Sequence, residues 1–284
     1  MQAQFGSTAV SDNPTGIYLD SAFGRVYVDC YNSQKVQVFS DSGTFLSTLA
    51  NTGFTGNALV WAPTGVCGDP YGHVYVVDAL RNDVQKFNAD GTFGWKTSTS
   101  IGLYVPTACT YSSLSGSIWV TDTGNDRVVE LSTANGAKLS TFSSIQLPTE
   151  IAAAPDGTLF VSSNSGFNMT QVTPTGEVLT QFGEFGTVPN QFRSLSGIAI
   201  QSVGGVPTTV YVSDENSDVI RPVTATAQPF STTATLPAPA SPSPAPFATS
   251  PPSSALPAPA QPSSTLPTSA PSHAAAPASA AAKP

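Results

Sequence analysis

A strand pattern that occurs five times is the feature that most constrains the fold of this chain. Each copy places an aliphatic residue, an aromatic residue and a valine in succession, followed by a variable residue and a usually acidic one. The five copies are Val26-Tyr27-Val28, Val74-Tyr75-Val76, Ile118-Trp119-Val120, Leu159-Phe160-Val161 and Val210-Tyr211-Val212, and their acidic column holds Cys30, Asp78, Asp122, Ser163 and Asp214. An aliphatic residue or Met follows each acidic position at the same spacing, so the chain is a repeat protein with a period of roughly 40 to 50 residues.

The remaining part of each repeat predicts four short strands. A Pro-Thr-Gly motif or a relative of it opens the first strand, as at Pro63, and a turn that ends in glycine follows, as at Gly72. The valine-rich pattern is the second strand, a polar loop leads to the third, and a second turn such as Asp90-Gly91 leads to a fourth. Each repeat is therefore expected to be a four-stranded antiparallel meander.

The second strand is apolar at consecutive positions, which indicates a sheet that is covered on both faces. Four-stranded sheets at this period, each sandwiched between neighbours, are typical of the blades of a β-propeller. Helical solenoids share the period but need apolar residues at helical spacing. We therefore predict an all-β fold, a β-propeller of four-stranded antiparallel blades that occupies residues 1–224.

Two of the repeats carry a resemblance to a known family. The segment from Pro63 to Gly91 and the segment from Ile118 to Val128 resemble NHL repeats, and Phe182-Gly183-Glu184-Phe185-Gly186 is similar to the linkers between NHL blades. The resemblance covers residues 1–224 and is specific for the fold, but it is nearly silent on function. The chain departs from the pattern where Cys30 and Ser163 replace the acidic residue and where the fifth repeat lacks the proline.

Two interpretations of ring closure remain open. The fifth repeat offers no fourth strand after Val223, whereas Gln4-Phe5-Gly6 repeats Gln181-Phe182-Gly183 at the end of the fourth strand of the fourth repeat. Residues 2–6 could therefore complete the fifth blade and close a five-bladed ring, which protects the last sheet edge. The resemblance implies the alternative, because NHL propellers usually have six blades and this chain would then be a fragment that lacks one.

Residues 225–284 have a different composition from the repeats. No Asp, Glu, Lys or Arg occurs from Pro222 to Ala282, and Pro, Ala and Ser dominate. Such a segment has little apolar surface to bury, so we expect a disordered Pro/Ala/Ser-rich tail. The stretch from Ser241 to Pro246 resembles hydroxyproline-rich cell-wall glycoproteins and other O-glycosylated stalks.

Charge and cysteine content narrow the class of partner and the compartment. The chain has 18 acidic and 10 basic residues, a balance that disfavours nucleic acid, and no long apolar run indicates a membrane. We expect a monomer. Cys67 and Cys109 fall on first strands near the ring centre and Cys30 at a strand end, so we expect buried thiols in a reducing compartment. The chain as written is then cytoplasmic, or extracellular and in the cell wall if an upstream signal peptide is missing.

Residues that could support catalysis are scarce. The two histidines, His73 and His273, cannot build a histidine-based metal site, and no Ser, His, Asp constellation is present. Asp20 and Asp69 occupy equivalent places after their first strands, where capping of a turn explains them better than calcium binding. We expect no catalytic residue, no metal and no cofactor, and hence no enzyme.

The loops between second and third strands are the best candidates for a binding surface. They share one end of a propeller, where side chains can vary without disturbing the sheets. The candidate ligand-binding residues on this loop face are Tyr31, Asn32, Lys35, Arg81, Asn82, Asn125, Asp126, Arg127, Asn164, Asn168, Glu215 and Asn216. A solvated rim whose Asn and Asp residues only shape turns is the competing interpretation.

The function that this surface favours is non-enzymatic recognition of a protein or a glycan. One alternative is a structural cell-wall glycoprotein carried on the Pro-rich stalk. The other follows from the resemblance, since NHL propellers often follow RING and B-box modules: a propeller that recognises substrates in a ubiquitin-ligase pathway, as a fragment of a larger protein.

Overall fold

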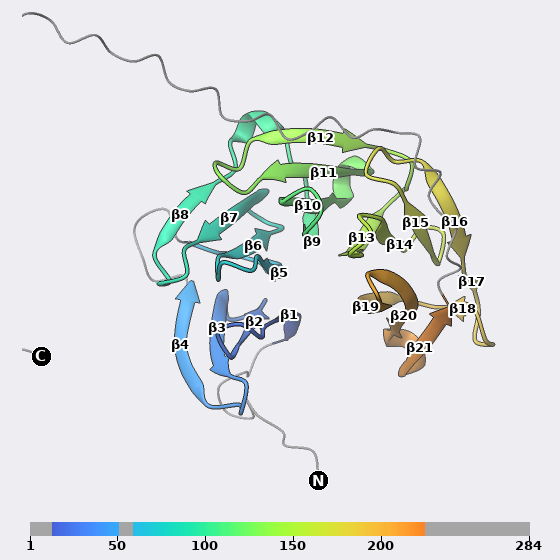
Figure 1. The fold of residues 1–284 in the computed structure, drawn as a ribbon, viewed down its shortest axis with the longest axis horizontal. Coiled ribbons are helices and arrows are strands. Elements are labelled where there is room, and N and C mark those ends of the chain that lie inside the picture. The colour runs from blue at the N-terminus through green and yellow to red at the C-terminus, as the bar shows by residue number, and fades with distance from the viewer. Residues whose placement is uncertain (1–12, 51–58, 225–284) are drawn as a thin grey trace, which may run out of the picture. The chain divides into compact units, whose positions relative to one another are not determined.

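The computed structural model describes residues 13–50 and 59–224, which form five successive antiparallel sheets arranged around a common centre (Figure 1). The sheets contain β1 (Pro14–Asp20), β2 (Arg25–Cys30), β3 (Lys35–Ser40) and β4 (Phe45–Ala50); β5 (Pro63–Gly68), β6 (Val74–Asp78), β7 (Asp83–Phe87) and β8 (Phe93–Lys96); β9 (Pro106–Ser112), β10 (Ser117–Asp122), β11 (Arg127–Ser132) and β12 (Lys138–Phe142); β13 (Pro148–Ala153), β14 (Leu159–Ser163), β15 (Asn168–Val172) and β16 (Val178–Phe182); and β19 (Leu195–Val203), β20 (Val206–Asp214) and β21 (Val219–Thr224). The predicted all-β propeller is confirmed.

The fifth sheet differs from the other four. It has three strands in the described part of the chain, and its linker from the fourth sheet carries a short parallel pair, β17 (Glu184–Phe185) and β18 (Gln191–Phe192). The predicted closing strand at residues 2–6 and the predicted tail at 225–284 lie outside the described residues. No helix of the described ranges is long and apolar enough to cross a membrane.

In the first four sheets the repeated aromatic residue of the second strand packs against the sheet that follows. Tyr27 clusters with Val66 and Val76 of the second sheet, and Trp119 clusters with Ile151 and Val161 of the fourth. Both aromatic side chains are buried. The consecutive apolar residues are therefore explained by neighbouring sheets that cover both faces.

The Pro-Thr-Gly motif joins neighbouring first strands near the centre of the ring. The Thr15 hydroxyl donates to the Pro63 carbonyl at 3.0 Å, and the Thr64 hydroxyl donates to the Pro106 carbonyl at 3.3 Å. A Cβ atom on Gly65 would lie 2.7 Å from the carbonyl oxygen of Thr107, closer than real side chains approach. The threonine thus ties one sheet to the next, and the glycine permits the close approach that this bond requires.

A second contact between sheets involves the turns between third and fourth strands. Gly136 and Gly176 have φ angles of +69° and +85°, and each lies under an aromatic ring of the preceding sheet. Trp95 covers Gly136, and Phe142 covers Gly176. The turn glycine therefore meets two needs at once, a left-handed backbone and a flat surface for the neighbouring ring.

The expectation of thiols at Cys67 and Cys109 was wrong, because these residues form a disulfide. Cys67 lies on β5 and Cys109 on β9, and these innermost strands pack side by side with a Cα–Cα distance of 5.8 Å, within the range that a disulfide spans. Cys30 is buried outside any disulfide, and its Sγ lies 3.6 Å from Oε1 of Gln37. Reasoning from the sequence placed both bonded cysteines near the ring centre but missed that adjacent first strands bring them together.

Candidate functional site

The acidic residue that ends a second strand fixes the backbone at the loop end of the ring. Asp78 accepts hydrogen bonds from the N–H groups of Trp61 and Ala62, which precede the first strand, at 2.6 and 3.1 Å. The same carboxylate accepts from the N–H groups of Leu80 and Arg81 in the following loop at 3.2 and 3.0 Å. One buried carboxylate therefore holds both the linker and the loop in fixed positions.

The third sheet repeats this arrangement with side-chain donors. Asp122 accepts from the N–H of Tyr104 at 2.7 Å, from Nδ2 of Asn125 at 2.8 Å and from Nε of Arg127 at 2.6 Å. In the fourth sheet Ser163 replaces the acid and donates its hydroxyl to the carbonyl of the preceding linker. The acidic column thus serves to position the loop face.

Two linker residues on this face hold a backbone conformation that their side chains disfavour. Val105 and Leu147 have φ angles of +47° and +43°, although each precedes a proline and carries a bulky side chain. Their N–H groups donate to Oδ1 of Asn82 and of Asp126, at 2.7 and 2.8 Å, across the junction between neighbouring sheets. Such strained positions cluster at functional sites, where surrounding contacts maintain them.

The linkers and loops present large exposed side chains, which we call the loop-face patch. Its exposed members come from three successive sheets and their linkers: Trp61, Leu80, Tyr104, Val105 and Leu147. The patch also includes Arg81, whose side chain is 18% exposed. Trp61 and Tyr104 are 50% and 57% exposed, and the Arg81 guanidinium lies 5.1 Å from the centre of the Trp61 ring. The Tyr104 ring rests against Gly124 in the neighbouring loop. The patch therefore combines exposed rings with a fixed backbone.

Several of the predicted ligand-binding residues have side chains that are engaged within the ring. Asn82 and Asp126 hold the strained linkers, and Asn125 and Arg127 bind Asp122 and the carbonyl of Gly102. Arg81 forms an ion pair with Asp83 at 3.5 Å in addition to its contact with Trp61. These contacts agree with the competing interpretation for Asn82, Asn125, Asp126 and Arg127, in which such residues shape the rim.

The other predicted residues are spread over the remaining sheets. The half-buried members are Tyr31, Lys35, Asn164 and Asn168, and the exposed members are Asn32, Glu215 and Asn216. Asn168 donates to the carbonyl of Gly166, and the carbonyl of Asn216 accepts from Arg193. The members on the first and fifth sheets lie outside the three-sheet region that holds the loop-face patch, whereas the Asn164 N–H donates to the carbonyl of Leu147, a member of the patch, at 3.4 Å.

Trp61 and Tyr104 were missed by reasoning from the sequence alone. Both stand two positions before the proline that opens a first strand. A column drawn at that position through the second and third repeats would have shown two aromatic residues outside the strands. The recognition groups expected from the sequence lie in the loops after the second strands, whereas Trp61 and Tyr104 lie in the linkers before the first strands.

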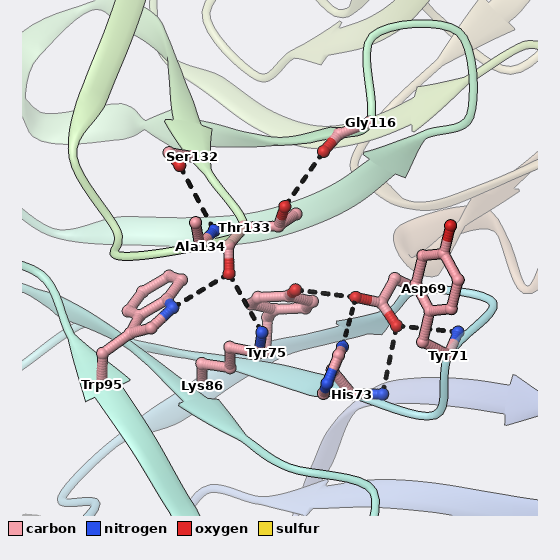
Figure 2. Close-up of polar contacts among 10 residues, drawn as sticks. All are labelled: Asp69, Tyr71, His73, Tyr75, Lys86, Trp95, Gly116, Ser132, Thr133 and Ala134. Atoms are coloured by element: carbon pink, nitrogen blue, oxygen red, sulfur yellow. Dashed lines mark hydrogen bonds and ion pairs between the residues drawn. The ribbon is translucent and has the colours of Figure 1, made fainter. Parts of the chain in front are cut away.

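A separate polar cluster joins the second and third sheets at the turn that follows β5 (Figure 2). Oδ1 of the buried Asp69 accepts from the N–H groups of Tyr71 and His73, as expected for a turn cap. Oδ2 lies 2.8 Å from Nδ1 of His73 and accepts from the Tyr75 hydroxyl at 2.9 Å. Beside it Lys86 donates to the carbonyl of Thr133 in the third sheet. Asp69 therefore caps its turn and binds Tyr75 of the same sheet, and Lys86 makes the hydrogen bond that reaches the third sheet.

Replacing Tyr75 with phenylalanine is expected to lower the free energy of unfolding by about 1.5 kcal/mol, because a hydrogen bond to a charged group is lost. The matched control is Tyr71→Phe, since the Tyr71 side chain is exposed and its hydroxyl makes no hydrogen bond to the other residues drawn in Figure 2. Chemical denaturation of both variants measures the difference. Equal stability of the two variants would show that the Asp69 network does not stabilise the fold.

Two carboxyl groups lie in surroundings that raise their pKa, Asp29 and Glu150. Asp29 on β2 is fully buried, neither of its carboxyl oxygens has a hydrogen-bond partner among the described residues, and burial, Asp78 and Glu150 raise its pKa well above the usual range. Burial raises the pKa of Glu150 on β13 to about 8. Within the described ranges, no three His, Cys, Asp or Glu side chains gather in a way that could hold a metal ion.

The raised pKa of Glu150 predicts a pH dependence of stability. The folded state binds this proton more tightly than the unfolded chain, so stability should fall as pH rises from about 4.5 to about 8. Replacement by glutamine removes the charged form, so Glu150→Gln should melt at a higher temperature than the wild type at about pH 8 and at a similar temperature at about pH 4.5. A difference in melting temperature between the wild type and Glu150→Gln that stays the same from about pH 4.5 to about pH 8 would contradict the burial of this carboxyl group.

Comparison with known proteins gives matches at the level of fold. No protein-family model matches the chain, and no curated protein does. Among solved structures, the chain is similar to one from a nidogen/laminin complex, with 19% identity, a TM-score of 0.52 and coverage of 60% of this chain and 63% of the other. It thus spans less than two thirds of that protein.

Two further structures are similar over more of the chain. A streptogramin B lyase shares 16% identity with a TM-score of 0.51, over 80% of this chain and 87% of the lyase. Hydrazine synthase of Kuenenia stuttgartiensis shares 13% identity with a TM-score of 0.53, over 78% and 70%. The comparisons and the sheet topology define the class of the protein, a β-propeller, and at these identities they show the fold alone.

Proposed function

We propose that this chain is a non-enzymatic binding propeller that captures a protein through the loop-face patch. The observation that carries the proposal is a pair of exposed aromatic side chains, Trp61 and Tyr104, with the half-buried Arg81 against the Trp61 ring. Asp78 and Asp122 fix the backbone that carries them. Residues of these three types dominate binding energy at protein interfaces. A fixed backbone lowers the conformational entropy that is lost on binding, so the strained linkers at Val105 and Leu147 favour a preformed site.

The comparisons support this proposal only through the fold. One similar structure belongs to a complex of nidogen with laminin. The streptogramin B lyase shows that a similar ring also carries catalysis in another protein. We favour binding over catalysis because the exposed rings of the loop-face patch suit an interface. We also propose that the propeller is a member of the NHL family.

The Cys67–Cys109 disulfide bears on the compartment in which the protein works. Disulfides persist in oxidising environments and are rare in the cytosol. The Cys67–Cys109 bond therefore supports an extracellular location, as for the alternative of a cell-wall protein on a Pro-rich stalk. It disfavours the alternative of a ubiquitin-ligase pathway, which operates in the reducing cytosol.

The test replaces the two exposed rings of the patch. Trp61→Ala with Tyr104→Ala should weaken partner capture by at least about thirtyfold, because the loss of a single interface hot spot already costs about 2 kcal/mol or more. Partners are captured from native extract by the wild-type chain and quantified against the variant. Arg127 is unsuitable for this test because it is the first residue of β11 and binds the buried Asp122.

Tyr71→Ala is the matched control, since Tyr71 is an exposed ring on the turn after β5, at the opposite end of the strands from the patch. It should capture the partner as well as the wild type does. Equal capture by the patch variant and the control would place the site elsewhere on the ring. Loss of capture after glycosidase treatment of the extract would identify a glycan as the ligand instead of a protein.

A further inference from the structure

The backbone N–H groups of the loop-face patch are used within the ring. Each member of the patch donates its N–H to a side-chain oxygen of Asp78, Asp122, Asn82 or Asp126, and the donors are Trp61, Leu80, Arg81, Tyr104, Val105 and Leu147. A ligand that adds a strand to a sheet needs free backbone N–H groups as well as free carbonyls. The patch therefore binds through its side chains.

These side chains offer hydrogen-bond donors on an apolar surface. The indole N–H of Trp61 and the hydroxyl of Tyr104 make no hydrogen bond to another described residue. Indole and the Arg81 guanidinium can only donate. The other members have aliphatic side chains: Leu80, Val105 and Leu147. The patch thus has no carboxylate or amide group of its own.

The side-chain acceptors that adjoin the patch hold its linkers in place. Oδ1 of Asn82 accepts from the N–H of Val105 at 2.7 Å, and Oδ1 of Asp126 accepts from the N–H of Leu147 at 2.8 Å. A glycan presents hydroxyl groups, each of which donates a hydrogen bond as well as accepting one. The patch therefore suits a ligand that is rich in acceptors and poor in donors better than it suits a glycan.

The patch contains one charged side chain, and that charge is paired. The Arg81 guanidinium lies 3.5 Å from Asp83 and 5.1 Å from the centre of the Trp61 ring. Recognition of acidic or phosphorylated motifs uses clusters of arginine residues. A single paired arginine does not form such a cluster, so the patch fits an uncharged segment of a protein.

Proline-rich segments combine these properties. A proline residue has no backbone N–H, offers a carbonyl acceptor and carries an apolar ring. Runs of proline adopt the polyproline II helix before they bind, and they dock on surfaces lined by aromatic side chains. We propose that the loop-face patch binds a proline-rich segment of the partner protein, an inference that rests on the proposed function of this patch.

The two aromatic rings of the patch are held ready for such a ligand. Tyr104 rests against Gly124, and Trp61 lies against the guanidinium of Arg81, while both aromatic residues remain exposed. A ring that is already held loses little conformational entropy when a proline ring packs on it. Nε1 of Trp61 and the hydroxyl of Tyr104 then donate to carbonyl groups of the ligand.

Binding of a fluorescently labelled decaproline peptide to the full chain tests the inference. Decaproline should bind saturably, and a glycine-serine peptide of equal length should bind at least about tenfold more weakly, because that peptide is a flexible coil with an N–H at every residue. Trp61→Ala should weaken decaproline binding at least about tenfold. Tyr104→Phe keeps the ring and removes one donor, so it should weaken binding about fivefold.

Tyr71→Ala is the control, since Tyr71 is exposed at the other end of the strands. It should bind decaproline as the wild type does. Equal binding by the wild type and Trp61→Ala, an equal loss in Tyr71→Ala, or no binding up to about 1 mM peptide would overturn the inference.

Competition separates the failure of this inference from the failure of the proposed function. Excess decaproline should displace the partner that the wild-type chain captures from native extract. If capture requires Trp61 and Tyr104 but decaproline does not displace the partner, the proposed function stands and the proline-rich ligand is overturned. Capture that does not require these two residues overturns both.

A second copy of this chain is the alternative source of the ligand, because residues 225–284 are rich in Pro, Ala and Ser. Sedimentation of the full chain distinguishes the two sources. The mass should not depend on concentration if the ligand belongs to a partner protein. A mass that rises with concentration in the wild type but not in Trp61→Ala would overturn the partner protein in favour of a second copy.

Discussion

Replacing Trp119 with alanine is expected to unfold the ring or to weaken it severely. Trp119 is 1% exposed on β10 and packs between the third and fourth sheets against Ile151, Leu159 and Phe142. Truncation of a buried Trp costs about 3 to 5 kcal/mol, which is a large share of the 5 to roughly 15 kcal/mol that stabilises a typical domain. Circular dichroism melting and chemical denaturation measure the loss.

The matched control is Trp119→Phe. Nε1 of Trp119 has no hydrogen-bond partner among the described residues, so phenylalanine loses no hydrogen bond and keeps a ring near Phe142. This variant should lose much less stability than the alanine variant, since only part of the packed volume is removed. A soluble alanine variant with a cooperative transition near that of the wild type would show that β10 is not packed between two sheets.

The fold could be read from the sequence because each repeated column serves a physical need in every sheet. The aromatic residue of the second strand fills the space before the next sheet, as Trp119 does, and the glycine of Pro-Thr-Gly permits close approach, as Gly65 does. The same packing requirements recur in every repeat, so the residues that meet them form a periodic sequence pattern. In the described residues the fifth sheet has three strands, and the sequence shows no pattern of a fourth strand after Val223.

The candidate site could be predicted only in part, because it depends on contacts between repeats. The acidic column holds the linker that precedes its repeat, since Asp78 binds the N–H groups of Trp61 and Ala62. A pattern within one repeat does not show this contact. Residues chosen for their hydrogen-bonding capacity, such as Asn125, use that capacity within the ring. The exposed rings Trp61 and Tyr104 share a column, but it holds aromatic residues in only the second and third repeats and lies in the linkers, outside the strand pattern.

The disulfide could not be predicted from the sequence for the same reason, because it depends on a contact between two repeats. Cys67 and Cys109 occupy different positions within their repeats, and Cys67 follows the column that Cys109 occupies. The register of β5 against β9 decides whether their side chains meet. That register is set by contacts such as the bond from Thr64 to the Pro106 carbonyl, which a single repeat does not reveal.

Reduction of the Cys67–Cys109 bond is expected to lower the melting temperature by roughly 8 to 16 °C. The bond closes a loop across a sequence separation of 42, and loss of that constraint on the unfolded chain costs about 4 kcal/mol in the chain-entropy model. For a domain of this size each 1 kcal/mol shifts the melting temperature by about 2 to 4 °C. Cys67→Ala with Cys109→Ala should show the lowered value and no further response to reductant. A wild-type melting temperature that reductant leaves unchanged would contradict the bond, and with it the oxidising compartment that we propose.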